Sequence, residues 1–304
     1  MNDVSKNFSS LLGLRAAEIE AVLERLLSPS PAGEEIIRPP KLLAAMRHGV
    51  LNGGKRIRPF LVIEAARIFD ADREAALATG AALELIHCYS LIHDDLPAMD
   101  DDELRRGKPT VHVAFDEATA ILAGDSLLTL AFDVLARPQN GLDDTRKAAL
   151  VFGLAQAAGI GGMAGGQGLD LDAESSAPDE AGIVQLQSMK TGALLRYACE
   201  AGAIVGNAEE KERDRLKRFG EMTGLAFQLA DDLLDVTSDA SQMGKATGKD
   251  AARGKGTLVG LHGVEWARNR LVGLVGEACA LLEPFGNRAD TLRQTACFIA
   301  SRES

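Results

Sequence analysis

Aromatic residues are scarce in this chain of 304 residues and make up only 4% of it. The hydrophobic fraction is nevertheless 46%. We therefore expect a sizeable core that is built from Leu, Ala, Val and Ile rather than from rings. The chain contains no stretch that resembles a long linker, so we expect a single domain over residues 1–304.

Cysteine and histidine are also rare, and neither shows the spacing of metal ligands. The four cysteines are scattered without a CxxC pair, which predicts reduced thiols that pack as small hydrophobic residues. The five histidines show no zinc pattern. An excess of positive charge is missing as well, because the net charge is −11, and this argues against a nucleic-acid partner. It does not exclude anionic substrates, since local charge matters more than the total.

Long apolar runs and alternating patterns are absent too. No apolar run approaches a membrane span, and the N-terminus lacks a signal-peptide core, so we expect a cytoplasmic protein without a membrane span. No alternation of period two is long enough for a sheet, whereas apolar residues recur at helical spacing, which predicts an all-α fold. The predicted helices span residues 8–27, 41–51, 60–68, 73–92, 115–135 and 211–237, and further helices are expected within 259–299.

What the chain does have is an acidic cluster that runs directly into a basic one. Residues 94–103 contain six carboxylates, and Arg105, Arg106 and Lys108 follow. Carboxylates packed this closely repel one another unless a cation lies among them, and Mg²⁺ fits because it combines one or two carboxylates with waters and phosphate oxygens. Taken alone, the cluster is equally compatible with a solvated acidic loop. A calcium loop of the EF-hand type is a poor match, because the glycine and glutamate offsets are wrong.

A second acidic group favours chemistry over a solvated loop. Asp231, Asp232 and Asp235 lie in an apolar, helix-like run, and on a helix Asp231 and Asp235 project from one face. Like charges at this spacing destabilise a bare helix, and a bound metal ion reverses that effect. In the first cluster Asp94 and Asp100 are six residues apart with Pro97 between them. The helix must therefore bulge or end near Pro97 for both side chains to reach one site.

These two clusters resemble the DDxxxxD and DDxxD motifs of the trans-isoprenyl diphosphate synthase (polyprenyl synthetase) family, and most closely those of bacterial farnesyl diphosphate synthases. The resemblance extends from the Gly-Gly-Lys-Arg-Ile-Arg-Pro stretch at residues 53–59 to the C-terminal helix. It implies a helical bundle of the isoprenoid synthase type around a central active-site cavity, several Mg²⁺ ions, and a homodimer. It also implies a prenyltransferase that condenses isopentenyl diphosphate with dimethylallyl or geranyl diphosphate to give farnesyl diphosphate, by ionisation, condensation and elimination.

The resemblance assigns a role to each site residue. The carboxylates expected to hold Mg²⁺ are Asp94, Asp100 and Asp231, with Asp95 and Asp235 in support and Asp232 as a further catalytic residue. The cations expected to stabilise the departing diphosphate are Arg105, Lys190, Lys245 and Lys255. The residues expected to hold isopentenyl diphosphate are Lys55, Arg58, His87 and Arg106. The residues expected to turn oxygen atoms toward the carbocation are Thr191 and Gln228. The bound pyrophosphate is expected to take the final proton, so no side chain is expected to act as the base.

Other readings of the same stretches remain open. The basic residues 53–59, taken alone, are typical of a solvated turn, and residues 239–256 are either a basic surface loop or a lid that closes over diphosphate. The glycines of residues 159–168 imitate a dinucleotide fingerprint, but no strand precedes them. They resemble instead the family's small-residue helix, in which Gln167 and Asp170 line the site.

The product length depends on the residues just before the first aspartates. Tyr89 lies about one and a half helical turns before Asp94, where an aromatic side chain in the resembled family forms the floor of the chain pocket. Taken alone, Tyr89 is an ordinary core tyrosine. Geranylgeranyl diphosphate synthase is the alternative function. A terpene cyclase needs no second diphosphate site, so the turn with Lys55 and Arg58 counts against that alternative. A non-catalytic partner of a prenyltransferase would be expected to have lost one of the two aspartate motifs, and both motifs are intact.

Overall fold

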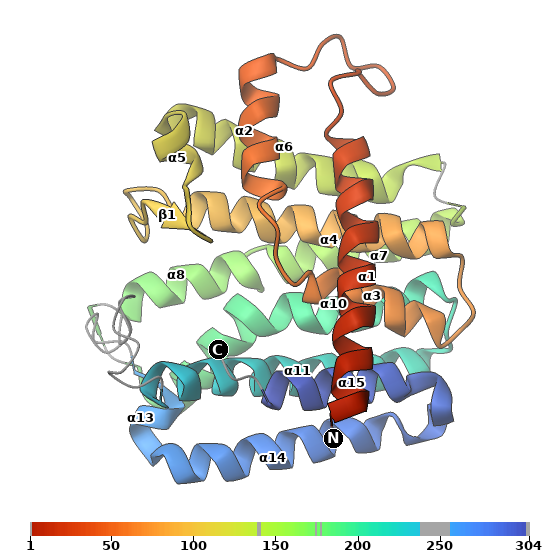
Figure 1. Ribbon diagram of the computed structural model, residues 1–304, viewed down its shortest axis with the longest axis vertical. Helices are drawn as coiled ribbons and strands as arrows, with labels where there is room; N and C mark the ends of the chain where they lie inside the picture. Colours follow the sequence, from red (N-terminus) through yellow and green to blue (C-terminus); the bar gives the residue numbers. More distant parts are fainter. Residues whose placement is uncertain (1, 139–140, 174, 177, 238–255, 302–304) are drawn as a thin grey trace. The chain divides into compact units, whose positions relative to one another are not determined.

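The computed structural model describes residues 2–138, 141–173, 175–176, 178–237 and 256–301, and Figure 1 shows that helices dominate this part of the chain. The strands within the described ranges form one antiparallel hairpin of two-residue strands, β1 (Leu104–Arg105) and β2 (Lys108–Pro109). The predicted all-α class is confirmed. The chain divides into two compact units. Unit 1 comprises Met1–Ile63 and Asp72–Val151, and unit 2 comprises Glu64–Ala71 and Phe152–Ser304. The single domain remains a prediction.

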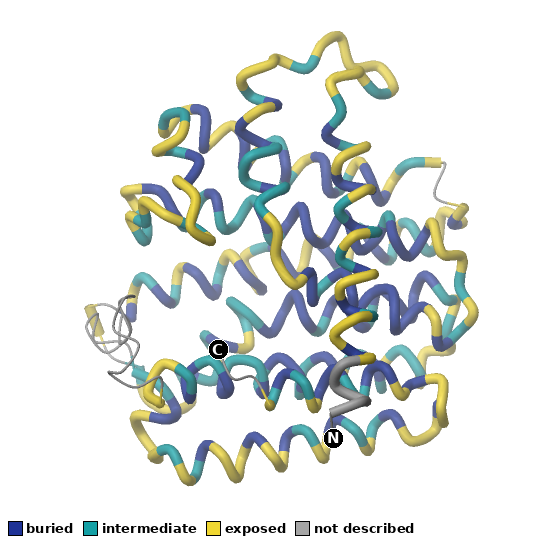
Figure 2. Tube along the Cα trace, in the orientation of Figure 1, coloured by how far each residue is buried: buried dark blue, intermediate teal, exposed yellow. Residues whose placement is uncertain are grey.

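Unit 1 is built around the buried helix α4. Its helices are α1 (Asn2–Leu26), α2 (Pro40–Val50), the first part of α3 (Ile57–Arg67), α4 (Arg73–Asp94), α5 (Val111–Ala114), α6 (Glu117–Ala136) and the first part of α7 (Asp144–Ala158). Helix α4 packs against α6, α1 and α2, and Figure 2 shows it buried along most of its length. It begins where Asp72 accepts a hydrogen bond from the backbone N–H of Ala75 at 2.8 Å, a typical N-terminal cap.

Unit 1 also contains a cavity of about 900 Å³. It lies between the end of α1, the segment of residues 32–39, α2 and α6, and it is lined by Leu43, Met46, Leu122 and Leu130 together with polar side chains such as Asp125. None of the predicted site residues lines it. The central active-site cavity that the resemblance implies therefore remains a prediction.

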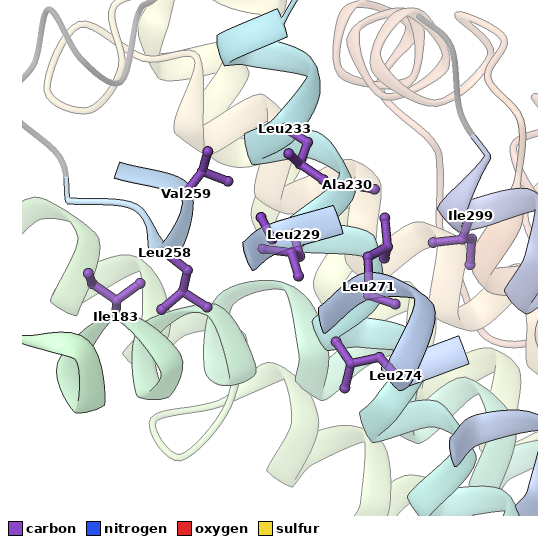
Figure 3. Packing of buried hydrophobic residues seen from close by; sticks show 11 residues of the cluster. Ile183, Leu229, Ala230, Leu233, Leu258, Val259, Leu271, Leu274 and Ile299 are labelled. Carbon is purple, nitrogen blue, oxygen red and sulfur yellow. The ribbon is translucent and has the colours of Figure 1, made fainter. Parts of the chain in front are cut away.

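Unit 2 surrounds the long helix α11. Its elements after the end of α7 are α8 (Met163–Ala173), α9 (Glu180–Gln187), the π-helical turn η2 (Ser188–Gly192), α10 (Ala193–Val205), α11 (Glu210–Thr237), α13 (Leu258–His262), α14 (Val264–Leu281), the 3₁₀ segment η4 (Glu283–Ala289) and α15 (Asp290–Ala300). Helix α11 lies between α10 and α14 (Figure 1), and it also contacts η2 and α15. Figure 3 shows the hydrophobic cluster that fixes its C-terminal half, in which Leu229 and Leu233 pack with Leu258, Leu271 and Ile299.

Two long helices follow the predicted boundaries closely, whereas α1 begins at Asn2 and not at the predicted Phe8. The expected helix at 73–92 is α4, and the expected helix at 211–237 is α11. Helix α3 begins at Ile57 rather than at Pro59, because proline is tolerated in the first turn, where its missing N–H has no helical acceptor.

Three helical stretches correct the statement that no apolar run approaches a membrane span. By length and composition alone, α4, α6 and the stretch Asp144–Ala173 are long and apolar enough to cross a membrane. The reason lies in their alanine and leucine content, which keeps mean hydropathy high around isolated polar residues. The most apolar segment of α4 is 72% buried within the protein, so its apolar side chains form part of the hydrophobic core.

Candidate active site

The first aspartate cluster begins where α4 ends. Helix α4 stops at Asp94, and the chain then turns so that the backbone N–H of Asp100 donates to the carbonyl of Asp94 at 2.8 Å. The six-residue spacing is thus closed by a turn around Pro97, which confirms that the helix ends there. The turn brings the backbone of Asp100 back to Asp94 at the end of α4. The two residues have to be close together if they are to bind one ligand.

Asp95 already has a cationic partner. It is buried, and Nε of Arg105 donates to both of its carboxylate oxygens at 2.8 and 3.0 Å. Burial raises the pKa of Asp95, and the hydrogen bond from Arg105 opposes that shift. The same carboxylate raises the pKa of Arg105 against the opposing effect of burial. Arg105, predicted to act on diphosphate, therefore neutralises Asp95 and anchors β1 to the end of α4.

Arg106 is presented by the turn of the β hairpin. Arg106 and Gly107 both have positive φ, 52° and 74°, as a two-residue turn between twisted antiparallel strands requires. The guanidinium of Arg106 donates to the carbonyl of Gly53. A Cβ atom at Gly54 would lie 2.6 Å from Nη1 of Arg106, so the absence of a side chain is what admits the guanidinium here.

His87 lies among four arginines of unit 1. Burial, and then the charges of Arg58, Arg106, Arg56 and Arg105, lower its pKa well below the usual value. The imidazole is therefore neutral at pH 7 in the free protein. The structure thus brings together Arg58, His87 and Arg106, three of the four residues predicted to hold isopentenyl diphosphate. The fourth, Lys55, is exposed on the neighbouring turn.

Arg56 has a different role from its neighbours in the sequence. It is 4% exposed and adopts a positive φ of 50°, whereas Lys55 beside it is exposed. Its guanidinium donates to Glu84 at 2.7 Å, to Glu20 at 2.8 Å and to the carbonyl of Val50 at 2.6 Å. Burial opposes its charge, but Glu84 and Glu20 outweigh this and raise its pKa. Arg56 therefore ties the basic turn to α1 and α4.

Tyr89 is partly buried near the end of α4, as expected for a residue just below the aspartates. Its ring meets the imidazole of His93 edge to face, with 5.8 Å between the ring centroids. His93 in turn contacts the carbonyl of Ile121 through Nε2 at 3.0 Å. A Cβ atom at Gly124 would collide with the same nitrogen, so this glycine in α6 makes room for His93. Burial raises the pKa of Tyr89, and the nearby charge of Asp94 adds to the shift.

The second aspartate cluster lies near the C-terminal end of α11. Leu229, Ala230 and Leu233 join the hydrophobic cluster of Figure 3, whereas Asp231 is only partly buried and Asp235 is exposed. Asp232 differs from both, because it is 4% exposed and accepts hydrogen bonds from Gln187 at 2.9 Å and from Gln228 at 3.0 Å. Asp232 is therefore more deeply buried than the two aspartates predicted to bind or support metal.

The turn η2 presents Lys190 and Thr191 between two helices of unit 2. Lys190 donates to Asp170 of α8 at 2.7 Å, and the hydroxyl of Thr191 donates to Oε1 of Gln228 at 3.1 Å. A π-helical turn of this kind is rare and is frequently found at functional sites. Gln167 of α8 is 8% exposed, and its amide nitrogen and oxygen have no hydrogen-bond partner within the described ranges. A buried orphan amide at this point fits a side chain that faces a ligand.

Some predicted residues cannot be placed. Lys245 and Lys255 lie outside the described residues, as does most of the predicted lid.

Among the residues that the structure does describe, no group of three or more histidine, cysteine, aspartate or glutamate side chains is arranged to hold a metal ion. The donor chemistry nevertheless fits Mg²⁺, because this ion takes carboxylate oxygens one or two at a time and completes its coordination with water and phosphate.

Three features of the site had not been inferred from the sequence: the burial of Arg56, the role of Gln187 and the π-helical turn. One signal was available for Arg56. Glu84 lies between Leu83 and Leu85 in an apolar helix, and a carboxylate in such a position requires a buried cation. Gln187 carries no comparable signal, because its partner Asp232 is 45 residues away.

Comparison with known proteins gives consistent results over most of the chain. A family model described as polyprenyl synthetase matches residues 39–278. The chain is 42% identical over 274 residues to farnesyl diphosphate synthase of Escherichia coli strain K12, and the match covers 90% of each protein. It is 43% identical over 265 residues to the chloroplastic geranylgeranyl pyrophosphate synthase 11 of Arabidopsis thaliana, covering 86% of this chain and 74% of that one. The structure of an FPP/GFPP synthase from Zymomonas mobilis matches with a TM-score of 0.86 and 44% identity, over 97% of this chain and 99% of the other.

Proposed function

The chain belongs to the polyprenyl synthetase family, and from this premise we propose that it is a prenyltransferase that makes farnesyl diphosphate from isopentenyl diphosphate and an allylic diphosphate. The observation that carries the proposal is the match to farnesyl diphosphate synthases along most of both chains. The polyprenyl synthetase model matches residues 39–278, which include both aspartate clusters and the basic turn. The allylic partner is dimethylallyl or geranyl diphosphate.

We propose that Asp94, Asp100 and Asp231 hold Mg²⁺ ions, with Asp95 and Asp235 in support. When bound, Mg²⁺ would neutralise charge on the departing diphosphate. The pairing of Asp95 with Arg105 supports an indirect role for Asp95, since that carboxylate already has a cation. Replacement of Asp94 or Asp231 by Asn is expected to abolish turnover and to weaken Mg²⁺ binding, which isothermal titration with Mg²⁺ and the inert diphosphate analogue methylenediphosphonate measures.

The chain's own cations bind and orient the two substrates. Lys55, Arg58, His87 and Arg106 hold isopentenyl diphosphate, and the grouping of three of them in unit 1 supports this assignment. Arg105, Lys190, Lys245 and Lys255 stabilise the leaving diphosphate. In the free protein Arg105 is paired with Asp95 and Lys190 with Asp170, so each is held in place before substrate arrives.

Thr191 and Gln228 act on the allylic cation that ionisation leaves behind. Both carry oxygen atoms and are only partly buried beside the π-helical turn. Oxygen dipoles turned toward a carbocation stabilise it without attacking it, provided that water is excluded. The proton lost in the final step passes to the released pyrophosphate.

We propose that Tyr89 sets the product length at fifteen carbons. The edge-to-face contact of its ring with His93 supports this role, because it fixes the ring near the end of α4, where the floor of a chain pocket is predicted. The similarity to a geranylgeranyl pyrophosphate synthase and to an FPP/GFPP synthase keeps longer products as the alternative.

Product analysis by mass spectrometry tests both proposals. Purified protein is incubated with Mg²⁺ and isopentenyl diphosphate, together with dimethylallyl, geranyl or farnesyl diphosphate in separate reactions. We expect elongation to stop at farnesyl diphosphate, and we expect Tyr89→Ala to extend it. Elongation of farnesyl diphosphate by the unaltered protein would contradict the product length and leave the chemistry standing. The absence of condensation in every reaction would refute the enzyme assignment.

We further propose that the enzyme works in the cytoplasm as a homodimer, without a membrane span and without nucleic acid. The net charge of −11 supports the last point. Helix α6 supports the dimer, because it is strongly apolar yet leaves Ile121 and Leu122 about half exposed. Exposed apolar side chains next to each other in a helix are a feature of surfaces that another protein covers.

A further inference from the structure

Four side chains of unit 2 form a hydrogen-bonded chain that ends at Thr191. Nε2 of Gln187 donates to Oδ2 of Asp232 at 2.9 Å, and Nε2 of Gln228 donates to Oδ1 at 3.0 Å. Oε1 of Gln228 then accepts the hydroxyl proton of Thr191 at 3.1 Å. Asp232 and Gln187 are buried, 4% and 7% exposed, whereas Gln228 and Thr191 are partly exposed. This series of hydrogen bonds therefore runs from the interior of unit 2 to the partly exposed side chain of Thr191, which a ligand can reach.

The direction of every hydrogen bond in this chain follows from Asp232. Both carboxylate oxygens of Asp232 act as acceptors here, so both glutamines turn their NH₂ groups toward it. The carbonyl oxygen of Gln228 then faces Thr191, and because it can only accept, the hydroxyl of Thr191 must donate. Thr191 has a single proton to give. Its lone pairs are consequently what it offers to any other neighbour.

Close packing holds this chain in register. Gln187 is the last residue of α9, and Thr191 lies four residues later within η2. They bond to Asp232 and Gln228, which are one turn apart on α11. At the next turn a Cβ atom at Gly224 would lie 3.0 Å from the Cα of Gly192, so the two backbones nearly touch there. On the other side, a Cβ atom at Gly166 of α8 would collide with the backbone of residue 190. The turn that carries Thr191 is thus clamped between α8 and α11.

We propose that Asp232 and Gln187 are positioning residues that fix the polarity of the Thr191 hydroxyl, so that it presents lone pairs and not its proton to the allylic carbocation. This inference rests on the proposed function. The direction matters because an oxygen lone pair stabilises an adjacent cation, whereas an O–H hydrogen turned toward it repels it. Asp232 accordingly acts through Gln228 and Thr191 rather than as a metal ligand.

The substitution Asp232→Asn reverses the chain without a change of size. The introduced asparagine keeps one acceptor and gains one NH₂ group, so one of the two glutamines has to flip. We expect the flip at Gln228, because it is only partly buried whereas Gln187 is 7% exposed. The NH₂ group of Gln228 then donates to Thr191, and the hydroxyl proton turns outward. With isopentenyl and geranyl diphosphates we expect kcat to fall about 10- to 100-fold, somewhat less than the roughly 100- to 1,000-fold loss on complete removal of one stabilising dipole, while both KM values change less than about threefold.

A double-mutant cycle with Thr191→Val separates this role from a structural one. Thr191→Val removes the hydroxyl whose direction Asp232 sets, so Asp232→Asn is expected to reduce kcat by less than about twofold in that background. Thr191→Ser keeps the hydroxyl and is expected to retain most of the activity. Full additivity of the Val and Asn substitutions would overturn the proposal.

The exchange of charge between Gln187 and Asp232 gives the sharpest test. In Gln187→Glu/Asp232→Asn, the introduced glutamate accepts from the NH₂ group of the introduced asparagine. The oxygen of that asparagine again accepts from Gln228, and the original polarity returns. We expect this double variant to recover most of the kcat that Asp232→Asn loses, whereas Gln187→Glu alone places two carboxylates together and loses activity.

Two controls make the outcomes distinct. Circular dichroism and thermal unfolding establish that each variant is folded, and the Mg²⁺ dependence of the rate is measured for each. If Asp232→Asn raises the Mg²⁺ requirement and the exchange restores nothing, Asp232 is a metal ligand and the proposal is wrong. If the unaltered protein condenses no substrate, the proposed function fails and the positioning role fails with it.

Discussion

Arg56 shows how one residue can order a whole basic turn. Its charge is buried, and the cost of that burial is offset only because Glu84 and Glu20 both accept from it. The positive φ of 50° is unfavourable for a residue with a side chain, so the contacts must hold the backbone in place. The result is that Lys55 stays at the surface while Arg56 enters the core. Of the three cations in this turn, Arg56 stabilises the fold, whereas Lys55 and Arg58 are the ones predicted to bind substrate.

Replacement of Arg56 by Met is expected to destabilise the protein by about 3–5 kcal/mol, because the buried carboxylate of Glu84 then lacks its partner. The free energy of unfolding in urea measures this. Arg270→Met on α14 is the matched control, since it breaks an exposed pair with Glu277 at 2.9 Å and is expected to cost less than about 1 kcal/mol. Equal losses in the two variants would contradict the buried role of Arg56.

His87 gives the protein a predictable response to acid. Its pKa is lowered in the folded protein, whereas in the unfolded chain it titrates near the ordinary value of about 6.5. The unfolded chain therefore binds a proton below about pH 6.5 that the folded protein does not bind. The stability that the neutral imidazole contributes is complete above that pH and is lost as the pH falls below it.

Replacement of His87 by Gln removes this proton uptake. Between pH 7.5 and 5.5 we expect the unfolding free energy of the unaltered protein to fall by about 1 kcal/mol more than that of His87→Gln. Urea unfolding of both proteins at the two pH values provides the comparison, and the other titrating groups cancel in the difference. Parallel pH dependences would show that His87 is not held neutral.

At the scale of elements, glycines set how closely α11 approaches its neighbours. Gly220 and Gly224 are one turn apart on α11, and they face Arg196 and Gly192. A Cβ atom at Gly220 would lie 2.7 Å from the Cα of Arg196 and 2.8 Å from the carbonyl oxygen of Leu195. Because both of these are backbone atoms, α10 and α11 would have to separate, and no rotation of a side chain would relieve the contact.

The substitution Gly220→Ala is therefore expected to destabilise the protein by about 1–3 kcal/mol, as overpacking does. Gly276→Ala in α14 is the control, because no atom lies within 4 Å of the added carbon. Alanine there is expected to stabilise the helix by up to about 1 kcal/mol. Thermal unfolding of the two variants should shift the midpoint in opposite directions. A lower midpoint for both would mean that the loss at Gly220 is not caused by the close approach.

Over the whole molecule, the sequence allowed prediction of what depends on local pattern. The periodicity of leucine and alanine predicted α4 and α11 to within two residues at each end, because an amphipathic helix is visible within its own length. The turn after Asp94 was predicted from Pro97 and the six-residue spacing. The burial of Arg56 and the pairing of Gln187 with Asp232 depend on contacts between residues 28 and 45 positions apart. The apolar surroundings of Glu84 signal a buried cation without identifying Arg56, and no local pattern signals Gln187. The roles of the site residues in catalysis remain predictions.

The proposed homodimer is the remaining question at this scale, and α6 offers a direct test. Half of its apolar window is buried within the chain, while Ile121 is 45% and Leu122 is 55% exposed. In a two-fold symmetric dimer each substitution enters the interface twice. Leu122→Asp would bury two unpaired carboxylates, and we expect it to shift the protein from dimer to monomer in sedimentation velocity at micromolar concentration.

Val272→Asp is the matched control for this experiment. Val272 lies on α14 and is 73% exposed, so it presents an equally apolar side chain on a helix that the proposal does not use. We expect this variant to sediment like the unaltered protein. If Leu122→Asp also sediments unchanged as a dimer, α6 is not the interface, and if the unaltered protein is a monomer, the homodimer itself is wrong. A monomer produced by Val272→Asp alone would place the interface on α14, where the exposed valine and not Leu122 would be the apolar contact between two copies.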